Sequence, residues 1–312
     1  MHFVTIAALA VAAWGWCRGR KAVAGTTLLA AWRWGAAALS MSLLAAVAQA
    51  LKAASPGGLD HLWYAACVLW VCPAVAVLGA RRPGSAAWYG FVMVPLLLVL
   101  EWPVSGVALA GRISGASQGP LFEAVRLGGP ELVVWHVVLG LGGGNYLMTR
   151  RGGAVLAGAG GVLALLWPLS GSIPSGFWTD AVRLCGSLAL AAAPWWAGRR
   201  NSVLPLEPAA RREQRLARAW DDFYQAYGLV WAVRVEARVN EELARLEGGG
   251  VLGPGGVRFF EEDLVAEEVR DAVYRRAEST LRWLWGRFVD EVWVEKRLGP
   301  GAPLGAKEPD AL

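Results

Sequence analysis

The stretch Phe91–Gly111, FVMVPLLLVLEWPVSGVALAG, contains one ionisable residue, Glu101, at its centre. A helix that crosses a membrane needs about 20 predominantly apolar residues to cover the hydrocarbon core. The stretch therefore predicts a transmembrane helix, and it raises the question of why an acid lies in the middle of it.

The rest of the chain has the composition of a membrane protein. Of its 312 residues 55% are hydrophobic, and the mean hydropathy is +0.39, whereas soluble domains distribute a smaller apolar share over broken runs. Residues 1–198 hold 12 Lys+Arg and 5 Asp+Glu, while residues 199–312 hold 18 and 20. Because the net charge of +5 arises beside the apolar segments, we attribute it to membrane topology and expect no nucleic-acid partner.

Seven apolar windows come close to the length of a span: 3–17, 34–51, 61–80, 89–110, 132–148, 153–170 and 182–198. The first window is short, but no positively charged segment precedes it, as one would in a signal peptide, and RGRK follows it. We therefore interpret it as a span whose N-terminus is outside.

The basic residues support this count, because cytoplasmic loops of membrane proteins carry an excess of Lys and Arg. Clusters follow every second window, and the loops 52–60, 111–131 and 171–181 hold only scattered charges. The clusters are Arg18, Arg20, Lys21 and Arg33, then Arg81 and Arg82, then Arg150 and Arg151, then Arg199 and Arg200. The sequence thus predicts an all-α bundle of about seven spans over residues 1–200, with the N-terminus outside and the C-terminus inside.

Small residues predict which spans approach closely, since helices in lipid associate through close backbone contact. Gly140 and Gly144 lie four residues apart in the fifth window, and Gly153, Ala157 and Gly161 repeat that spacing in the sixth. We expect the fifth and sixth spans to pack tightly there.

Polar residues inside the windows are the candidate functional site. A carboxylate at a helix centre costs roughly 2.5–3.5 kcal/mol on insertion scales, so Glu101 should face the bundle interior. Pro103 frees a backbone carbonyl, and the hydroxyl of Ser105 lies one turn beyond Glu101. A bend at a buried acid is found in transport sites and also in helices that are merely kinked.

His136 is the candidate partner of Glu101, since it is the histidine that lies well inside a window. At about 1.5 Å per residue the two differ in depth by about 8 Å, which helix tilt can close. One hypothesis is a proton-accepting or ion-binding pair, and the other is two separate hydrogen bonds that fix helix packing. Asn145, near the inner end of the fifth window, is a further candidate for an interhelical hydrogen bond.

Motifs of known enzyme sites were not found in the sequence. It has three histidines, His2, His61 and His136, and no H-E-x-x-H or G-x-S-x-G pattern. The four cysteines fall in or beside apolar windows without a C-x-x-C pair, which is typical of packing residues. We expect no catalytic residue, no metal and no cofactor.

Residues 201–298 are predicted to form a cytoplasmic helical hairpin. One amphipathic helix is expected from just beyond Pro208 to about Leu246, with a small phase shift in its apolar stripe, and a second over 262–297. The glycine-rich segment 248–258 is expected to be a turn or mobile loop, and 299–312 a disordered tail. Two helices cover each other poorly, so we expect an exposed interaction face that includes Trp220, Phe223, Tyr227, Trp283 and Phe288.

Taken together, these features predict a multi-pass protein of a bacterial inner membrane. The favoured hypothesis is a non-enzymatic anchor or scaffold, embedded in the lipid bilayer, whose hairpin binds a cytoplasmic protein or a second copy of the chain. The alternative is a small-solute or proton-coupled transporter that uses Glu101 and His136.

Overall fold

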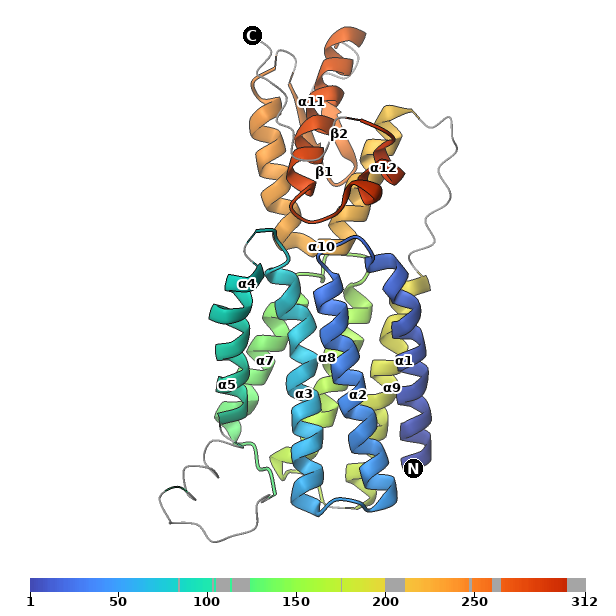
Figure 1. Ribbon diagram of the computed structural model, residues 1–312, viewed down its shortest axis with the longest axis vertical. Helices are drawn as coiled ribbons and strands as arrows, with labels where there is room; N and C mark the ends of the chain where they lie inside the picture. Colours follow the sequence, from blue (N-terminus) through green and yellow to red (C-terminus); the bar gives the residue numbers. More distant parts are fainter. Residues whose placement is uncertain are drawn as a thin grey trace. The chain divides into compact units, whose positions relative to one another are not determined.

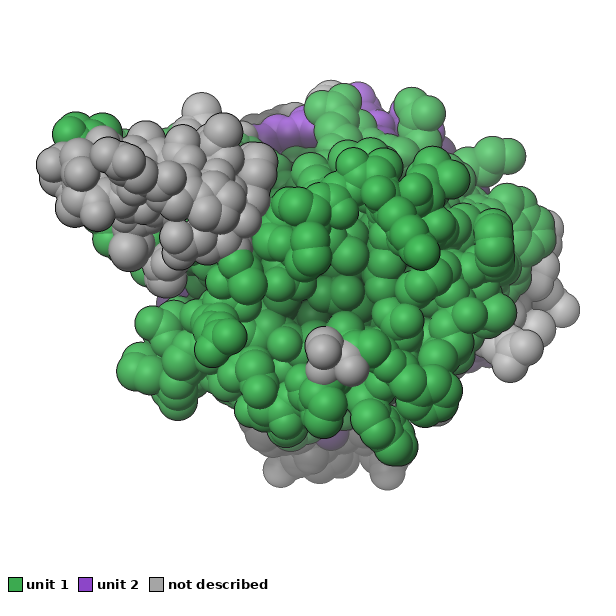
Figure 2. All heavy atoms as spheres, turned by 90° about the horizontal axis from the view of Figure 1, so that it is seen from below, with its two compact units in different colours: residues 1–23, 28–79, 84–202 green, residues 24–27, 80–83, 203–312 purple. Residues whose placement is uncertain are grey.

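The computed structural model describes residues 1–83, 85–102, 104, 113, 124–174, 176–199, 211–246, 249–259 and 265–301. The chain is mostly helical and divides into two compact units (Figures 1 and 2). Unit 1 consists of Met1–Val23, Leu28–Gly79 and Gly84–Ser202. Unit 2 consists of Ala24–Thr27, Ala80–Pro83 and Val203–Leu312.

Unit 1 is a bundle of helices, and each of the seven apolar windows overlaps at least one of them (Figure 1). The helices are α1 (His2–Val23), α2 (Leu29–Leu51), α3 (Pro56–Leu78), α4 (Ser85–Trp88), the π-helical turn η1 (Tyr89–Met93), α5 (Val94–Glu101), α7 (Gly129–Gly144), α8 (Gly152–Leu166), the 3₁₀ turn η3 (Trp167–Ser170) and α9 (Phe177–Arg199). Local signals set the boundaries: Ser55 Oγ accepts a hydrogen bond from Gly58 N, 3.2 Å away, at the start of α3, where Pro56 occupies the first turn.

Three helices of the described chain are long and apolar enough to cross a membrane: α2, α3 and Gly152–Ser170. The predicted seven-span bundle is therefore supported only in part. The last turns of α1 contain Arg20 and Lys21, and α9 contains Asp180 and Arg183, which lower the apolarity of these helices. The described helix over Tyr89–Glu101 is too short to qualify, and so is α7 with its 16 residues.

The interior of unit 1 is mostly apolar, and so is much of its outer surface. Trp63, Tyr64 and Cys67 of α3 and Trp135 of α7 lie in the core. Outward-facing side chains include Phe3, Phe91, Leu98, Leu141 and Leu156, each at least 60% exposed. A surface of this kind is costly in water and is stable in lipid.

Gly153 and Gly161 of α8 face α9 rather than α7, so the expected close packing of the fifth and sixth windows through these glycines is not found. A Cβ atom on Gly186 would lie 2.8 Å from the carbonyl oxygen of Gly161, and one on Gly161 would lie 2.9 Å from that of Gly186. Gly153 faces Trp196 of α9, while Gly140 and Gly144 have open space beside them. The spacing identified a close-packing face on α8, but spacing alone does not identify the neighbour.

Unit 2 contains α10 (Arg212–Leu243), a two-stranded antiparallel sheet of β1 (Gly250–Gly253) and β2 (Gly256–Phe259), α11 (Glu267–Trp285) and α12 (Glu291–Leu298). The sheet pairs Gly250 with Phe259 and Gly253 with Gly256. The side-chain amide of Asn240 holds β1 on α10, accepting from Leu252 N at 2.7 Å and donating to Leu252 O at 3.1 Å. The turn or loop expected over 248–258 is thus corrected to a β-hairpin.

The long second helix expected over 262–297 is also corrected. It is interrupted after Trp285, and α12 starts anew at Asp290, whose side chain accepts a hydrogen bond from Trp293 N at 2.9 Å. Between the two helices Val289 pairs with Thr26 in an isolated β-bridge. An apolar stripe continues across this break, which is why periodicity did not reveal it.

The first helix of unit 2 has a sharp corner at Gly228, with φ 75° and ψ −175°. Only glycine adopts this backbone region at low cost. Figure 1 shows α10 as two arms joined at this corner. The phase shift in the apolar stripe has its physical cause here, because the two arms are separate helical segments.

Two short segments from between the helices of unit 1 belong to unit 2. Thr27 N donates to Phe288 O at 2.8 Å, and Thr27 Oγ1 donates to Ala80 O at 2.6 Å. Arg82 N donates to Arg287 O at 2.8 Å. The hydroxyl of Tyr227 donates to Phe288 O at 2.7 Å and lies 3.2 Å from Thr27 Oγ1. Unit 2 is therefore assembled from three parts of the chain.

Candidate functional site

Glu101 ends α5 and its side chain is half-buried. The preceding residue, Leu100, is buried, and its carbonyl oxygen accepts a hydrogen bond from the hydroxyl of Tyr64 in α3. The ring of Tyr64 packs edge-on against Trp135 of α7, with ring centroids 6.0 Å apart. Tyr64 thus links α3 to α5 and α7, the helices that contain Glu101 and His136.

His136 lies on the exposed side of α7, next to the buried Trp135. Its Nδ1 is 2.7 Å from Leu132 O, one turn earlier in the same helix. The indole of Trp135, rather than the imidazole of His136, therefore faces the core. This orientation does not favour a proton-accepting pair of His136 with Glu101.

Of the other residues of the predicted intramembrane site, the structure describes Asn145. Asn145 follows the last residue of α7 and is 3% exposed, which fits an interhelical hydrogen-bonding residue. Ser105 and Pro103 lie outside the described residues, so the expected kink remains a prediction.

The most strongly buried charge of the described bundle belongs to Arg183, which the sequence patterns did not single out. This residue of α9 is 4% exposed, and its guanidinium donates to Asp60 Oδ1 of α3 at 3.1 Å. The guanidinium carbon also lies 5.5 Å from the ring centroid of Trp63. Its Nε has no hydrogen-bond partner among the described residues. An isolated buried charge is expensive, so Asp60 is the group that makes this position tenable.

A second set of polar contacts adjoins this ion pair. Asp180 Oδ1 accepts from Gln49 Nε2 at 2.6 Å, and Gln49 Oε1 accepts from Trp63 Nε1 at 3.2 Å. His2 Nε2 lies 3.7 Å from Asp180 Oδ2. Together with Asp60 and Arg183 these residues form what we call the Arg183 cluster.

The Arg183 cluster joins four helices at the end of unit 1 where α1, α3 and α9 begin and α2 ends. His2 begins α1, Gln49 lies close to the end of α2, Asp60 lies in the first turns of α3, and Arg183 in the second turn of α9. Figure 2 looks onto this end of unit 1. A charged pair with a hydrogen-bonded rim can hold four helices in register or bind a proton. Among the described residues no group of three His, Cys, Asp or Glu side chains is placed to hold a metal ion.

The residues of the predicted hairpin interaction face form the core of unit 2. Trp220, Phe223, Tyr227 and Phe288 are at most 3% exposed. Phe223 stacks on Tyr227 with ring centroids 4.7 Å apart and meets Phe288 edge-on at 5.4 Å. Trp283 alone of the five is partly exposed, and it stacks under the guanidinium of Arg287 at 4.8 Å. Four of these five side chains are therefore internal rather than available to a partner.

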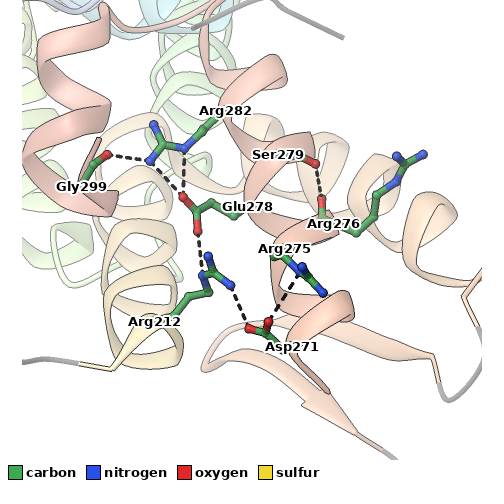
Figure 3. A network of polar contacts seen from close by, with 8 residues as sticks. All are labelled: Arg212, Asp271, Arg275, Arg276, Glu278, Ser279, Arg282 and Gly299. Atoms are coloured by element: carbon green, nitrogen blue, oxygen red, sulfur yellow. Dashed lines mark hydrogen bonds and ion pairs between the residues drawn. The ribbon is translucent and has the colours of Figure 1, made fainter. Parts of the chain in front are cut away.

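Ion pairs connect the helices of unit 2 that contribute to this aromatic core (Figure 3). Arg212, at the start of α10, contacts Asp271 at 2.8 Å and Glu278 at 3.4 Å, both in α11. Arg282, which is 5% exposed, donates to Glu278 Oε1 at 2.9 Å and to Gly299 O at 2.6 Å. The network ties the first turn of α10, the middle of α11 and the end of α12 together.

The carboxylate of Glu242 in α10 forms ion pairs with several arginines of unit 2. Glu242 Oε2 accepts from Arg276 at 2.7 Å, and Arg238 and Arg245 lie within 3.5 Å of its other oxygen. The hydrogen bond from Arg276 lowers the pKa of Glu242 below its ordinary value of 4.5. This pair fixes the second arm of α10 on α11.

Comparison of the chain with protein-family models, with curated proteins and with solved structures found no match. A function for the chain therefore has to be inferred from the arrangement of its described residues.

Proposed function

We propose that the chain is a multi-pass protein of the cell membrane, with its N-terminus outside and unit 2 in the cytosol. In this proposal it is a non-enzymatic anchor or scaffold that presents unit 2 to a cytoplasmic partner or to a second copy of the chain. The observation that supports it best is the assembly of unit 2 from the C-terminal region and the segments 24–27 and 80–83.

This assembly supports the proposed topology independently of hydropathy. Segment 24–27 follows the first apolar window and segment 80–83 follows the third. The positive-inside rule assigns both segments, and the chain beyond residue 200, to the cytosolic side. Three segments that form one compact unit must lie on one side of a bilayer, which agrees with that assignment.

The scaffold function is supported by how firmly unit 2 is linked to these segments. A peripheral domain on a flexible linker has one chain connection to its anchor. Unit 2 has hydrogen bonds from Thr27 and Arg82 to the segment around Phe288, so it is connected to helix ends at several points in the chain. Such a unit has more than one chain connection to its anchor, which is the arrangement we propose for a scaffold.

The test is a pull-down in mild detergent with two chains, the full chain and one that ends at Arg200. The shorter chain is used only if it elutes as a monodisperse species. The proposal predicts partners, or a second copy, that co-purify with the full chain alone. The same co-purifying proteins with both chains would contradict it.

A proton-coupled transporter is the second candidate, and the observation that favours it is the buried ion pair of Arg183 with Asp60. Buried charges in bundles often mark proton or solute routes. A route through Glu101 and His136 has weaker support, because His136 is exposed. Proton uptake into vesicles that contain the chain, abolished by Asp60→Asn and kept by Glu101→Gln, would favour transport at the Arg183 cluster.

A further inference from the structure

One face of α1 is exposed along the whole length of the helix. Exposed residues recur there at spacings of three and four, which places them on one side of an α-helix. They include Phe3, Ala7, Ala10, Trp14, Arg18 and Lys21. The buried residues of the same helix, on its other side, are Thr5, Ala8, Leu9 and Ala12.

This exposed face changes from apolar to basic near the end of the helix. Phe3 is 82% and Trp14 is 56% exposed. The first charged side chain after them is Arg18, and Lys21 follows one turn later. A face with this order of residues suits a lipid leaflet, with its acyl chains beside the apolar part and its headgroups beside the basic part.

The helices packed against α1 add no carboxylate at its basic end. Neither α1 nor α2 contains Asp or Glu. The acid of α9 is Asp180, which lies 3.7 Å from His2 at the opposite end of α1. Just beyond α1, Asp290 lies beside Gly25 and is engaged as the N-cap of α12. Within the described part of unit 1, Arg18 and Lys21 therefore face no acid of α1, α2 or α9.

The guanidinium of Arg18 is held in place by aromatic rings. Its central carbon lies 4.7 Å from the ring centroid of Trp14, one turn earlier in α1. The ring of Trp14 lies in turn 4.9 Å from that of Trp195 in α9. Stacking uses the flat face of a guanidinium and leaves the N–H donors along its edge for a phosphate. Arg18 is thus oriented before any lipid binds.

The length of α1 places these basic residues at the depth of the lipid phosphates. The apolar part of the helix, from His2 to Cys17, is about 24 Å long and is shorter than the hydrocarbon core of about 30 Å. A span shorter than the core draws its flanking basic residues to the headgroup level, where they extend toward the phosphates. Arg18 and Lys21 are the residues that flank this short span.

We infer that the exposed end of α1, which we call the Arg18 face (Ala10, Trp14, Arg18 and Lys21), binds an anionic phospholipid of the inner leaflet. Arg18 and Lys21 contact the phosphate, and the acyl chains lie along Ala10 and Trp14. The inference rests on the proposed location of the bundle in the cell membrane and adds a lipid partner to it. It involves residues of unit 1 alone.

The test uses the full chain in vesicles of phosphatidylcholine mixed with phosphatidylglycerol. The exposed Cys17 and Cys185 are replaced by serine, and a bimane fluorophore is attached at Ala10→Cys, about 12 Å from Arg18 along the helix. Lipids with brominated acyl chains quench a fluorophore that they touch. Competition between brominated phosphatidylcholine and unbrominated phosphatidylglycerol then gives the relative association constant of the two lipids at this position.

We expect phosphatidylglycerol to be favoured at Ala10→Cys by about fivefold or more, because each basic residue near an anionic headgroup contributes about that factor. The pair Arg18→Gln and Lys21→Gln should bring the ratio to about one, and Arg18→Lys with Lys21→Arg should retain the preference. All of these positions are exposed, so the substitutions leave the core intact. A ratio that the glutamine pair does not change would overturn the inference.

Two further labels serve as controls. Val4→Cys lies on the same face of α1, about 9 Å farther from Arg18, and is 54% exposed in the native chain. It reports lipids of the other leaflet, so the glutamine pair should leave its ratio unchanged. Leu156→Cys, at an exposed position of α8, reports whether the bundle lies in lipid.

These controls separate failure of the inference from failure of the proposed membrane location. If brominated lipid quenches Leu156→Cys while Ala10→Cys shows no preference for phosphatidylglycerol, the inference is overturned and the membrane location stands. The same holds if Ala10→Cys is quenched by neither lipid, because protein then covers the Arg18 face. If no label is quenched, the proposed membrane location fails together with the inference.

Discussion

Asp60→Asn should lower the free energy of unfolding of the bundle strongly, although it hardly changes the shape of the side chain. The amide keeps the size of the carboxylate but removes the counter-charge of Arg183, whose side chain is 5% exposed. A guanidinium stays protonated in proteins, so the charge persists without its hydrogen-bonded counter-ion, and only the more distant carboxylate of Asp180 still interacts with it. Breaking a buried pair by removing one partner costs about 3–5 kcal/mol. Because the side chain of Asp60 is 23% exposed, water reaches the site, and we expect a loss of about 3 kcal/mol.

The assay is reversible unfolding in mixed detergent micelles of rising SDS content, followed by tryptophan fluorescence. Arg183→Met, which removes the buried charge itself, should cost less than Asp60→Asn. The double variant should be more stable than the sum of the single effects predicts, by about 2 kcal/mol. Asp180→Asn is the control, because the amide can still accept from Gln49, and it should cost below about 1 kcal/mol. Additive effects of Asp60→Asn and Arg183→Met would refute the reasoning.

Three further predictions concern packing, backbone and pH. Gly186→Ala should destabilise unit 1 by about 1–3 kcal/mol in the same assay, because its Cβ would lie 2.8 Å from the carbonyl oxygen of Gly161 in α8. Gly158→Ala is the control and should be tolerated, because the nearest atom to its Cβ would be 4.0 Å away. Gly228→Ala should destabilise unit 2 by about 1–3 kcal/mol, because an alanine is strained at the φ of 75° found there. The measurement is the melting temperature of unit 2, and an unchanged melting temperature would show that the corner is not strained. Glu242→Gln should cost about 1 kcal/mol at pH 7. Because the hydrogen bond from Arg276 lowers the pKa of this carboxyl below 4.5, that difference should persist above pH 4.5 and vanish as the pH falls through the lowered pKa; an equal difference at pH 3 would contradict it.

Much of the helix content could be predicted from hydrophobic periodicity and length. Each apolar window overlaps helix in the part of the chain that the structure describes, because burial in lipid or in a core requires the same continuous apolar runs. The number of helices that cross the bilayer is harder to predict from sequence, since the charges of α1 and α9 reduce their apolarity. Their tertiary partners decide whether those charges are tolerated.

The Arg183 cluster could have been suspected from sequence but not assembled from it. Arg183 is a basic residue inside the last window, and Asp60 and Asp180 lie at window ends. Each one alone resembles an ordinary headgroup-level charge. The pairing of α9 with α1, and of α3 with α2, determines that these charges meet, and window order does not encode it.

Unit 2 shows where a periodic pattern misleads. The apolar stripe of residues 216–243 correctly marked buried side chains such as Phe223 and Tyr227, yet it did not show that they pack against α11 and the segment around Phe288. The β-hairpin had a local signal in the PGG turn between two short apolar runs. The contributions of segments 24–27 and 80–83 had none, because long-range pairing of short loops leaves no period.

The claim that residues 24–27, residues 80–83 and the C-terminal region form one cytosolic unit is tested most directly by cysteine labelling in intact cells. A membrane-impermeant maleimide is applied to chains without exposed native cysteines that contain Ala54→Cys, Arg81→Cys or Glu291→Cys. We expect Ala54→Cys to label from outside, and Arg81→Cys and Glu291→Cys to label only after the cells are permeabilised. Labelling of Arg81→Cys and Glu291→Cys from opposite sides of the membrane would contradict the account.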